Sequence, residues 1–203
     1  MNRKLAISDI HGHGELLLSL LHAACYHPPF DQLILLGDYI HKGPDTKGTI
    51  NIIRELWDQE AVVLRGNHEQ KVIDALPGTQ YFMERGKNFF HHMPLYYEDN
   101  QYIYVHAGIR PGIPMKLQLA EDLLRIREPF LNQPHQLPKQ VIFGHTSTDR
   151  LGMANHIWVR PDKIGIDTGA GHGKTLSLVD LTNKEVYSCH VKTGDITRQD
   201  FPG

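Results

Sequence analysis

The amino-acid sequence predicts an α/β fold with a largely parallel central sheet. Over residues 4–75 the same order of strand, polar loop and helix occurs three times. Such units pair their strands in parallel, because each helix carries the chain back to the start of the next strand. The carboxyl ends of the strands then share one edge of the sheet, where loops form binding sites. We therefore expect functional residues just after the apolar runs.

Each of the three units follows from a local pattern. The first has an apolar strand over 4–8 and a helix over 15–25, whose leucines recur on one face. The second has a strand within 32–38, a loop containing Gly and Pro, and a helix around 49–57. The third has a strand within 61–67 and a helix that begins near His68.

The second half of the chain adds antiparallel strands. It contains two strands within 95–108, a helix over 117–131 and a strand within 140–146, and hairpins over 156–169 and 175–191 that turn at Pro161-Asp162 and Thr182-Asn183. We expect one domain over 1–194, because a chain of 203 residues is too short for two full domains. The last residues, 195–203, are expected to form a loosely held tail.

The composition is that of an ordinary globular protein. Hydrophobic residues make up 40% and the formal net charge is −2, so no electrostatic footprint for nucleic acid or an anionic membrane is expected. No apolar run is long enough to span a membrane. Cys25 and Cys189 are too few for a disulfide framework, which favours a cytoplasmic location. The sequence does not define an oligomeric state.

Polar residues that can bind metals follow one apolar strand after another. Imidazole, carboxylate and amide oxygen together suit Mn²⁺, Fe or Zn²⁺ better than Ca²⁺ or Mg²⁺. Each residue alone has an ordinary structural explanation, such as a turn former or a packed histidine, but those explanations do not account for the repeated strand-end placement. Six ligands suffice for two ions about 3.5–4 Å apart that share a carboxylate. The six candidates are Asp9, His11, Asp38, Asn67, His106 and His145.

Six short motifs, in this order, make the chain similar to a known family. They are SDIHG, LLGDY followed by GP, LRGNHE, YVHAG, FGHT and IDTG. They resemble the calcineurin-like metallophosphoesterases, and among these the phosphoprotein phosphatases in their compact bacterial and phage form. The resemblance implies two packed, mixed β-sheets flanked by helices, a four-layer α/β sandwich with a dinuclear metal site at the strand ends.

The resemblance also implies individual roles. Asp9 and His11 would bind the first metal, Asp38 would bridge both, and Asn67, His106 and His145 would complete the second. His68 would donate a proton to the leaving group. The segment RIRE at 125–128 resembles the one that carries a phosphate-binding arginine, at Arg127, with Arg125 as the competing candidate.

The chain departs from the family at residues 41 and 42. Where the family has GDYVDRGP, this chain has GDYIHKGP, so His41 replaces the aspartate that holds the acid histidine and Lys42 replaces an arginine that binds phosphate. Lysine keeps the charge but loses the bidentate fork. His41 cannot act as an anionic partner, although a neutral ring nitrogen can accept the N–H of His68.

Three functions are consistent with these residues. The first is a serine/threonine protein phosphatase that uses two divalent ions, Mn²⁺ before Fe or Zn, for in-line attack of metal-bound hydroxide on a phosphorylated protein or small phosphoester. The second is a hydrolase of dinucleoside polyphosphates or other nucleotides. The third is a pseudophosphatase that binds phosphorylated partners without turnover. We expect the loop at 109–114 to contribute to specificity.

Overall fold

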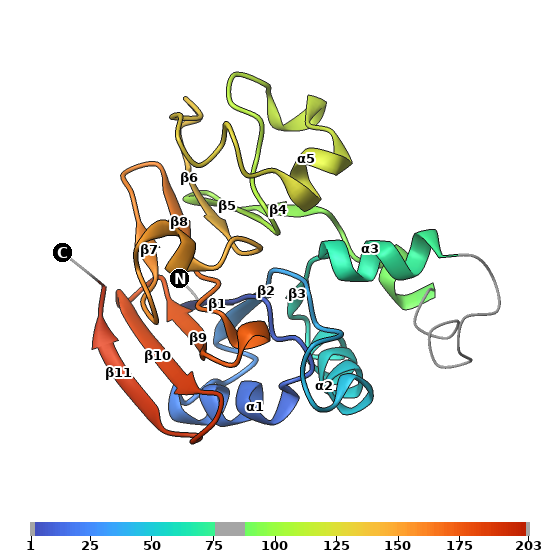
Figure 1. The fold of residues 1–203 in the computed structure, drawn as a ribbon, viewed down its shortest axis with the longest axis vertical. Helices are drawn as coiled ribbons and strands as arrows, with labels where there is room; N and C mark the ends of the chain where they lie inside the picture. Colours follow the sequence, from blue (N-terminus) through green and yellow to red (C-terminus); the bar gives the residue numbers. More distant parts are fainter. Residues whose placement is uncertain (1–2, 76–87, 202–203) are drawn as a thin grey trace.

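The computed structural model describes residues 3–75 and 88–201. They form two β-sheets packed face to face, with helices on the outer sides (Figure 1). This arrangement confirms the predicted fold class. In the described part of the chain, no helix is both long and apolar enough to cross a membrane.

The first sheet contains strands from both the N-terminal and the C-terminal parts of the chain. Its strand order is β11-β10-β9-β1-β2-β3, with β1, β2 and β3 parallel and the other three antiparallel. The strands are β1 (Arg3–Ile7), β2 (Asp31–Leu35), β3 (Val62–Val63), β9 (Thr175–Asp180), β10 (Glu185–His190) and β11 (Ile196–Asp200). The helices between the parallel strands are α1 (Gly14–Ala23) and α2 (Thr46–Asp58), followed after β3 by α3 (Asn67–Asp74).

The second sheet comes from the middle of the chain, in the order β4-β5-β6-β8-β7. Strands β5, β6 and β8 are parallel, and β4 and β7 close the edges antiparallel. The strands are β4 (Tyr96–Glu98), β5 (Tyr102–Val105), β6 (Gln140–Phe143), β7 (Trp158–Val159) and β8 (Lys163–Gly165). Helix α5 (Ala120–Arg125) and the 3₁₀ turns η1 (Met115–Leu117), η2 (Thr148–Leu151) and η3 (Ala170–His172) lie in the connections.

The core follows the two-residue alternation of the strands. In β2, Leu33 and Leu35 pack in the cluster that contains α1 and α2, while Ile34 packs in the cluster between the sheets. In β5, Tyr104 faces that same middle cluster and Ile103 faces a third, outer one. A strand buried on both faces, such as β5, is therefore apolar throughout, and the polar residue that follows it marks where the strand ends.

Two expectations from the sequence are wrong in detail. Residues Ile196–Asp200 are not a loose tail but form β11, because the edge of β10 offers backbone hydrogen bonds that order the segment without burying it. The helix expected over 117–131 is limited to Ala120–Arg125. The backbone leaves the helical conformation at Ile126, with ψ 141°. Pro129 disfavours a return to helix at Glu128, because proline restricts the residue before it to extended conformations.

Candidate active site

The predicted ligands lie in tight turns at the ends of parallel strands. Non-glycine residues with positive φ are uncommon and strained, and such strain concentrates at functional sites. The turns after β1, β2 and β6 contain six of them with φ between 46° and 67°. All six are predicted site residues: Asp9, His11, Asp38, His41, Lys42 and His145.

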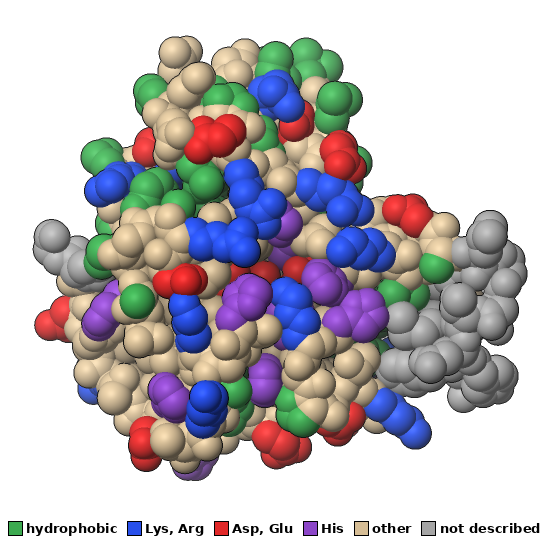
Figure 2. Space-filling model, in the orientation of Figure 1, with side chains coloured by type: hydrophobic (Ala, Val, Ile, Leu, Met, Phe, Trp, Pro, Cys, Tyr) green, Lys and Arg blue, Asp and Glu red, His purple; other side chains and the backbone are tan. Residues whose placement is uncertain are grey.

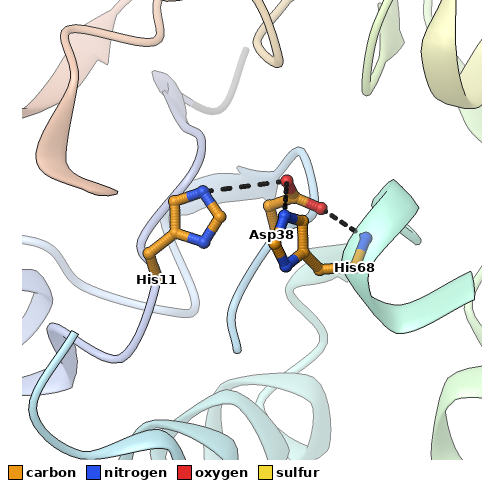
Figure 3. Close-up of side chains that lie close together, drawn as sticks. All are labelled: His11, Asp38 and His68. Carbon is orange, nitrogen blue, oxygen red and sulfur yellow. Dashed lines mark hydrogen bonds and ion pairs between the residues drawn. The ribbon is translucent and has the colours of Figure 1, made fainter. Parts of the chain in front are cut away.

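The carboxylate of Asp38 lies between imidazoles on both of its sides. Its Oδ2 is 3.7 Å from His11 Nε2 and 3.8 Å from His68 Nε2, and its Oδ1 is 3.5 Å from His106 Nε2. Figure 3 shows His11, from the turn after β1, and His68, from the start of α3, converging on this carboxylate. One carboxylate thus faces two separate groups of nitrogen ligands.

Asn67 begins α3 and connects the second group. Its Oδ1 lies 3.0 Å from His106 Nε2 and 2.8 Å from His145 Nδ1. Asp38, His106 and His145 present ligand atoms that all lie within 4.8 Å of one another, as do those of His11, Asp38 and His68.

Asp9 closes the site from the β1 side. Its Oδ2 accepts hydrogen bonds from the backbone N–H of His145, at 2.9 Å, and from Ser8 Oγ, and its Oδ1 lies 3.8 Å from His11 Nε2. A Cβ at Gly144 would collide with Ser8 Oγ and with the carboxylate of Asp9. Glycine therefore allows the turn after β6 to approach the turn after β1.

Backbone carbonyls orient two of the imidazoles. His11 Nδ1 lies 3.0 Å from the carbonyl of Ile40, and His106 Nδ1 lies 2.8 Å from that of Leu36. Because a carbonyl only accepts, each Nδ1 carries a proton, and at His11 the Nε2 lone pair then faces the site. Glu69 fixes the loop at Asp38 by accepting from the backbone N–H groups of Asp38 and Tyr39, at 2.8 and 2.9 Å.

The electrostatics of these groups suit a divalent cation. Burial lowers the pKa of His11 to about 4 and that of His145 to about 3, so both are neutral ligands at pH 7. Burial and the charge of Asp9 raise the pKa of Asp38, because two carboxylates there lack a compensating positive charge. Burial also opposes ionisation of Asp9, but His106, His11 and Ser8 outweigh it and lower its pKa. Neutral imidazoles beside buried, uncompensated carboxylates are the donor set that a metal requires.

His41 and Lys42 lie beside this cluster. His41 Nδ1 is 2.9 Å from His68 Nδ1, so the replacement residue still contacts the predicted acid. The pKa of His68 is lowered to about 3 by burial and then by the charges of His11 and Lys42. Lys42 Nζ lies 2.9 Å from His11 Nε2, where an ammonium donates to the imidazole lone pair. The side chain of Lys42 is exposed, so it can swing away from His11 when that nitrogen binds a metal.

A cleft of about 350 Å³ opens over the cluster. Figure 2 shows Lys and Arg side chains around this hollow, with histidine and acidic side chains at its floor. Both candidate arginines, Arg125 and Arg127, line it, together with Lys42. Arg125 is ion-paired with Glu121 at 3.2 Å, whereas the described residues include no acidic partner for Arg127. The geometry therefore favours Arg127 as the free anion-binding group.

Several lining residues were not identified from the sequence. They are Lys71, Ser147, Arg150 and His172. Lys71 lies one helical turn after His68 on α3, and this i, i+3 spacing was the one available signal for it. Conversely, the loop at 109–114 does not contribute to the described lining, because Arg110 binds Asp122 of α5 through two hydrogen bonds of 2.8 and 2.5 Å.

A four-layer sandwich that gathers carboxylates, imidazoles and an amide oxygen at its strand ends defines a metal-dependent hydrolase. The chain belongs to the calcineurin-like phosphoesterases, since the model of that family matches residues 3–184. The family implies divalent metal ions, and the two ligand groups around Asp38 agree with this. The resemblance noted in the sequence is thereby confirmed.

Curated relatives carry two kinds of name. Serine/threonine-protein phosphatase 2 of Escherichia coli K12 is 28% identical over 209 residues, covering 86% of this chain and 91% of the relative. Serine/threonine-protein phosphatase 1 of Salmonella typhimurium LT2 is 38% identical, over 36% of this chain and 33% of the relative. The symmetrical bis(5'-nucleosyl)-tetraphosphatase of Dechloromonas aromatica RCB is 30% identical, over 52% of this chain and 44% of the relative.

Solved structures share the fold. A proposed diadenosine tetraphosphatase superposes with a TM-score of 0.71 at 22% identity, covering all of this chain and 95% of the other. The cold-active protein-tyrosine phosphatase of a psychrophilic Shewanella superposes with a TM-score of 0.66 at 16% identity, covering all of this chain and 81% of the other. These similarities establish the fold but do not identify the substrate.

Proposed function

We propose that the chain is a serine/threonine protein phosphatase that depends on two divalent cations, with Mn²⁺ as the preferred ion. The observation that carries the proposal is the position of Asp38, whose two oxygens face His11 on one side and His106 on the other. Asp9 and His11 would hold one ion, and Asn67, His106 and His145 the other, with Asp38 shared between them. His68 Nε2 is also close enough to Asp38 to share a metal ion with it. The contact between His68 Nδ1 and His41, however, suits a proton donor.

Metal ions supply two kinds of chemistry at such a site: they polarise the phosphoryl oxygens and lower the pKa of a bound water. The cations of the chain do the rest of the binding. Lys42, in the turn after β2, and Arg127, in the segment after α5, both line the cleft and would hold the non-bridging phosphate oxygens. Their charges offset the negative charge of the phosphoryl group during hydrolysis.

His68 is placed to protonate the departing alkoxide. It lines the cleft, and its side chain is 15% exposed, so the ring can reach a substrate oxygen. An alkoxide of serine or threonine is a poor leaving group and benefits from such a proton. His41 would act as a positioning residue that accepts the Nδ1–H of His68 and thereby sets the direction of Nε2.

The name of the E. coli relative, which this chain matches over nearly its whole length, supports a phosphoprotein substrate. A second candidate, hydrolysis of dinucleoside tetraphosphates, is favoured by the number of cations in the cleft, which exceeds what one phosphate needs. A pseudophosphatase is disfavoured because all six ligands are present and converge. Two unpaired cysteines support a reducing compartment.

Purified protein with Mn²⁺, assayed on a phosphoserine peptide, diadenosine tetraphosphate and p-nitrophenyl phosphate, tests the proposal. We expect turnover of all three, with the highest kcat/KM among the natural esters on the phosphopeptide. His68→Asn should reduce turnover of the phosphopeptide most, while His22→Asn, an exposed change on α1, serves as the matched control. Binding of Mn²⁺ without any turnover would favour the pseudophosphatase.

A further inference from the structure

The cleft contains more positive charge than one phosphate requires. Five cationic side chains line it: Lys42, Lys71, Arg125, Arg127 and Arg150. Within residues 3–75 and 88–201, an acidic partner is found for Arg125 alone, which pairs with Glu121. The proposed function uses Lys42 and Arg127 for the reacting phosphate, which leaves Lys71 and Arg150 without a role.

Arg150 keeps its charge although an aspartate precedes it. Asp149 turns away from Arg150, because its Oδ1 accepts from Ser147 Oγ at 2.6 Å and its Oδ2 pairs with Lys174 Nζ at 2.5 Å. These two contacts lower the pKa of Asp149 to about 2, so the carboxylate stays committed to Lys174. The guanidinium of Arg150 therefore faces the cleft uncompensated.

Arg150 lies in the same cleft as the proposed metal ligands. It belongs to η2, which begins three residues after His145, and it shares the cleft lining with Ser147 and His172. A Cβ at Gly171 would collide with the ring of His11, so η3, which ends at His172, packs directly on that ligand. Burial lowers the pKa of His172, and the charges of Lys42 and Arg150 lower it further.

We propose that Arg150, with His172, forms a second anion subsite that binds an additional phosphate group of the substrate beside the reacting one. The inference rests on the proposed function. Guanidinium binds phosphate oxygens through paired hydrogen bonds, and a ring N–H of His172 can donate one more. The second phosphate comes either from a phosphoanhydride chain or from a neighbouring phosphorylated residue of a peptide.

The substitution Arg150→Gln tests the subsite, with Arg160→Gln as the matched control, since Arg160 stacks over Trp158 outside this cleft. Values of kcat/KM are measured for two substrate pairs: diadenosine tetraphosphate against p-nitrophenyl phosphate, and a doubly against a singly phosphorylated peptide. Loss of a hydrogen bond to a charged group predicts that the ratio within a pair falls about tenfold or more in Arg150→Gln. The pair that responds identifies the source of the second phosphate. Equal losses on all four substrates, or the same change in Arg160→Gln, would overturn the proposal.

A binding measurement separates this inference from the proposed function. Titration calorimetry of pyrophosphate and of inorganic phosphate, at fixed free Mn²⁺, needs no turnover. We expect Arg150→Gln to weaken binding of pyrophosphate about tenfold more than binding of phosphate. If no ester is hydrolysed but this difference is found, the subsite stands and the proposed activity fails. An unchanged ratio of the two affinities contradicts the subsite, whether or not the protein is an active enzyme.

Discussion

The Nδ1 atoms of His41 and His68 lie 2.9 Å apart. One of the two nitrogens must donate and the other must accept, and when His68 is charged its Nδ1–H donates to the lone pair of His41. An imidazole, unlike a carboxylate, does not stabilise the charged form of its partner. Burial and nearby cations already lower the pKa of His68 to about 3. The pair therefore orients the acid but leaves it mostly uncharged at neutral pH.

This relationship predicts that the double change His41→Asp with Lys42→Arg increases turnover of a phosphoserine peptide by about tenfold, a part of the ~10²–10⁴-fold that a positioned acid contributes. The gain should be smaller on p-nitrophenyl phosphate, whose leaving group needs little protonation. Steady-state kcat on the two substrates checks it, and adding His68→Asn should abolish the gain. A loss of activity on both substrates would show that His41 contacts the substrate or a metal directly.

Arg125 and Arg127 should differ in their contribution to phosphate binding. Arg127→Gln is expected to reduce kcat/KM about 10²-fold, the effect of removing one preorganised donor, because no acidic side chain in the described part of the chain competes for it. Arg125→Gln should reduce it by less than about threefold, since its charge is shared with Glu121 at 3.2 Å and exposed pairs contribute little. The reverse order, measured on one phosphopeptide, would assign phosphate binding to Arg125.

The segment after α5 that bears Arg127 is held by a buried lysine. Lys163 Nζ donates to the carbonyls of Phe130 and Gln133, at 2.6 and 2.7 Å, and pairs with Asp162 at 3.1 Å. Lys163→Met leaves both carbonyls without this donor, so we expect a loss of about 2–4 kcal/mol in unfolding free energy.

Urea denaturation measures the loss caused by Lys163→Met, with the exposed change Lys116→Met as control. At a temperature where both proteins are folded, Lys163→Met should also have a lower kcat/KM than the unchanged protein, since Arg127 is no longer held in position. Normal stability and normal kinetics would show that the segment is held by its apolar contacts alone.

Much of the centre was predictable because its chemistry follows the strands. Asp38 follows the end of β2 by three residues and His106 follows β5 directly, and the sequence shows both as polar residues that end an apolar run. Arg150 could not be found in this way, because it reaches the cleft from η2 and its free charge depends on Asp149 pairing with Lys174, a contact across 25 positions of the chain. Pairing of β11 was missed for a similar reason, since an exposed edge strand carries no hydrophobic pattern.

Metal content tests most directly whether Asp38 joins two metal sites, because it reports on the ligands without requiring a substrate. Elemental analysis of the protein after equilibration with Mn²⁺ and removal of free ions should find two ions per chain. In Asp38→Asn it should find fewer than one, since the carboxylate shared by both groups of ligands is lost. Asp45→Asn, a change at the exposed N-cap of α2, should keep both ions. Two ions per chain in Asp38→Asn, as in the unchanged protein, would contradict a site built around this carboxylate.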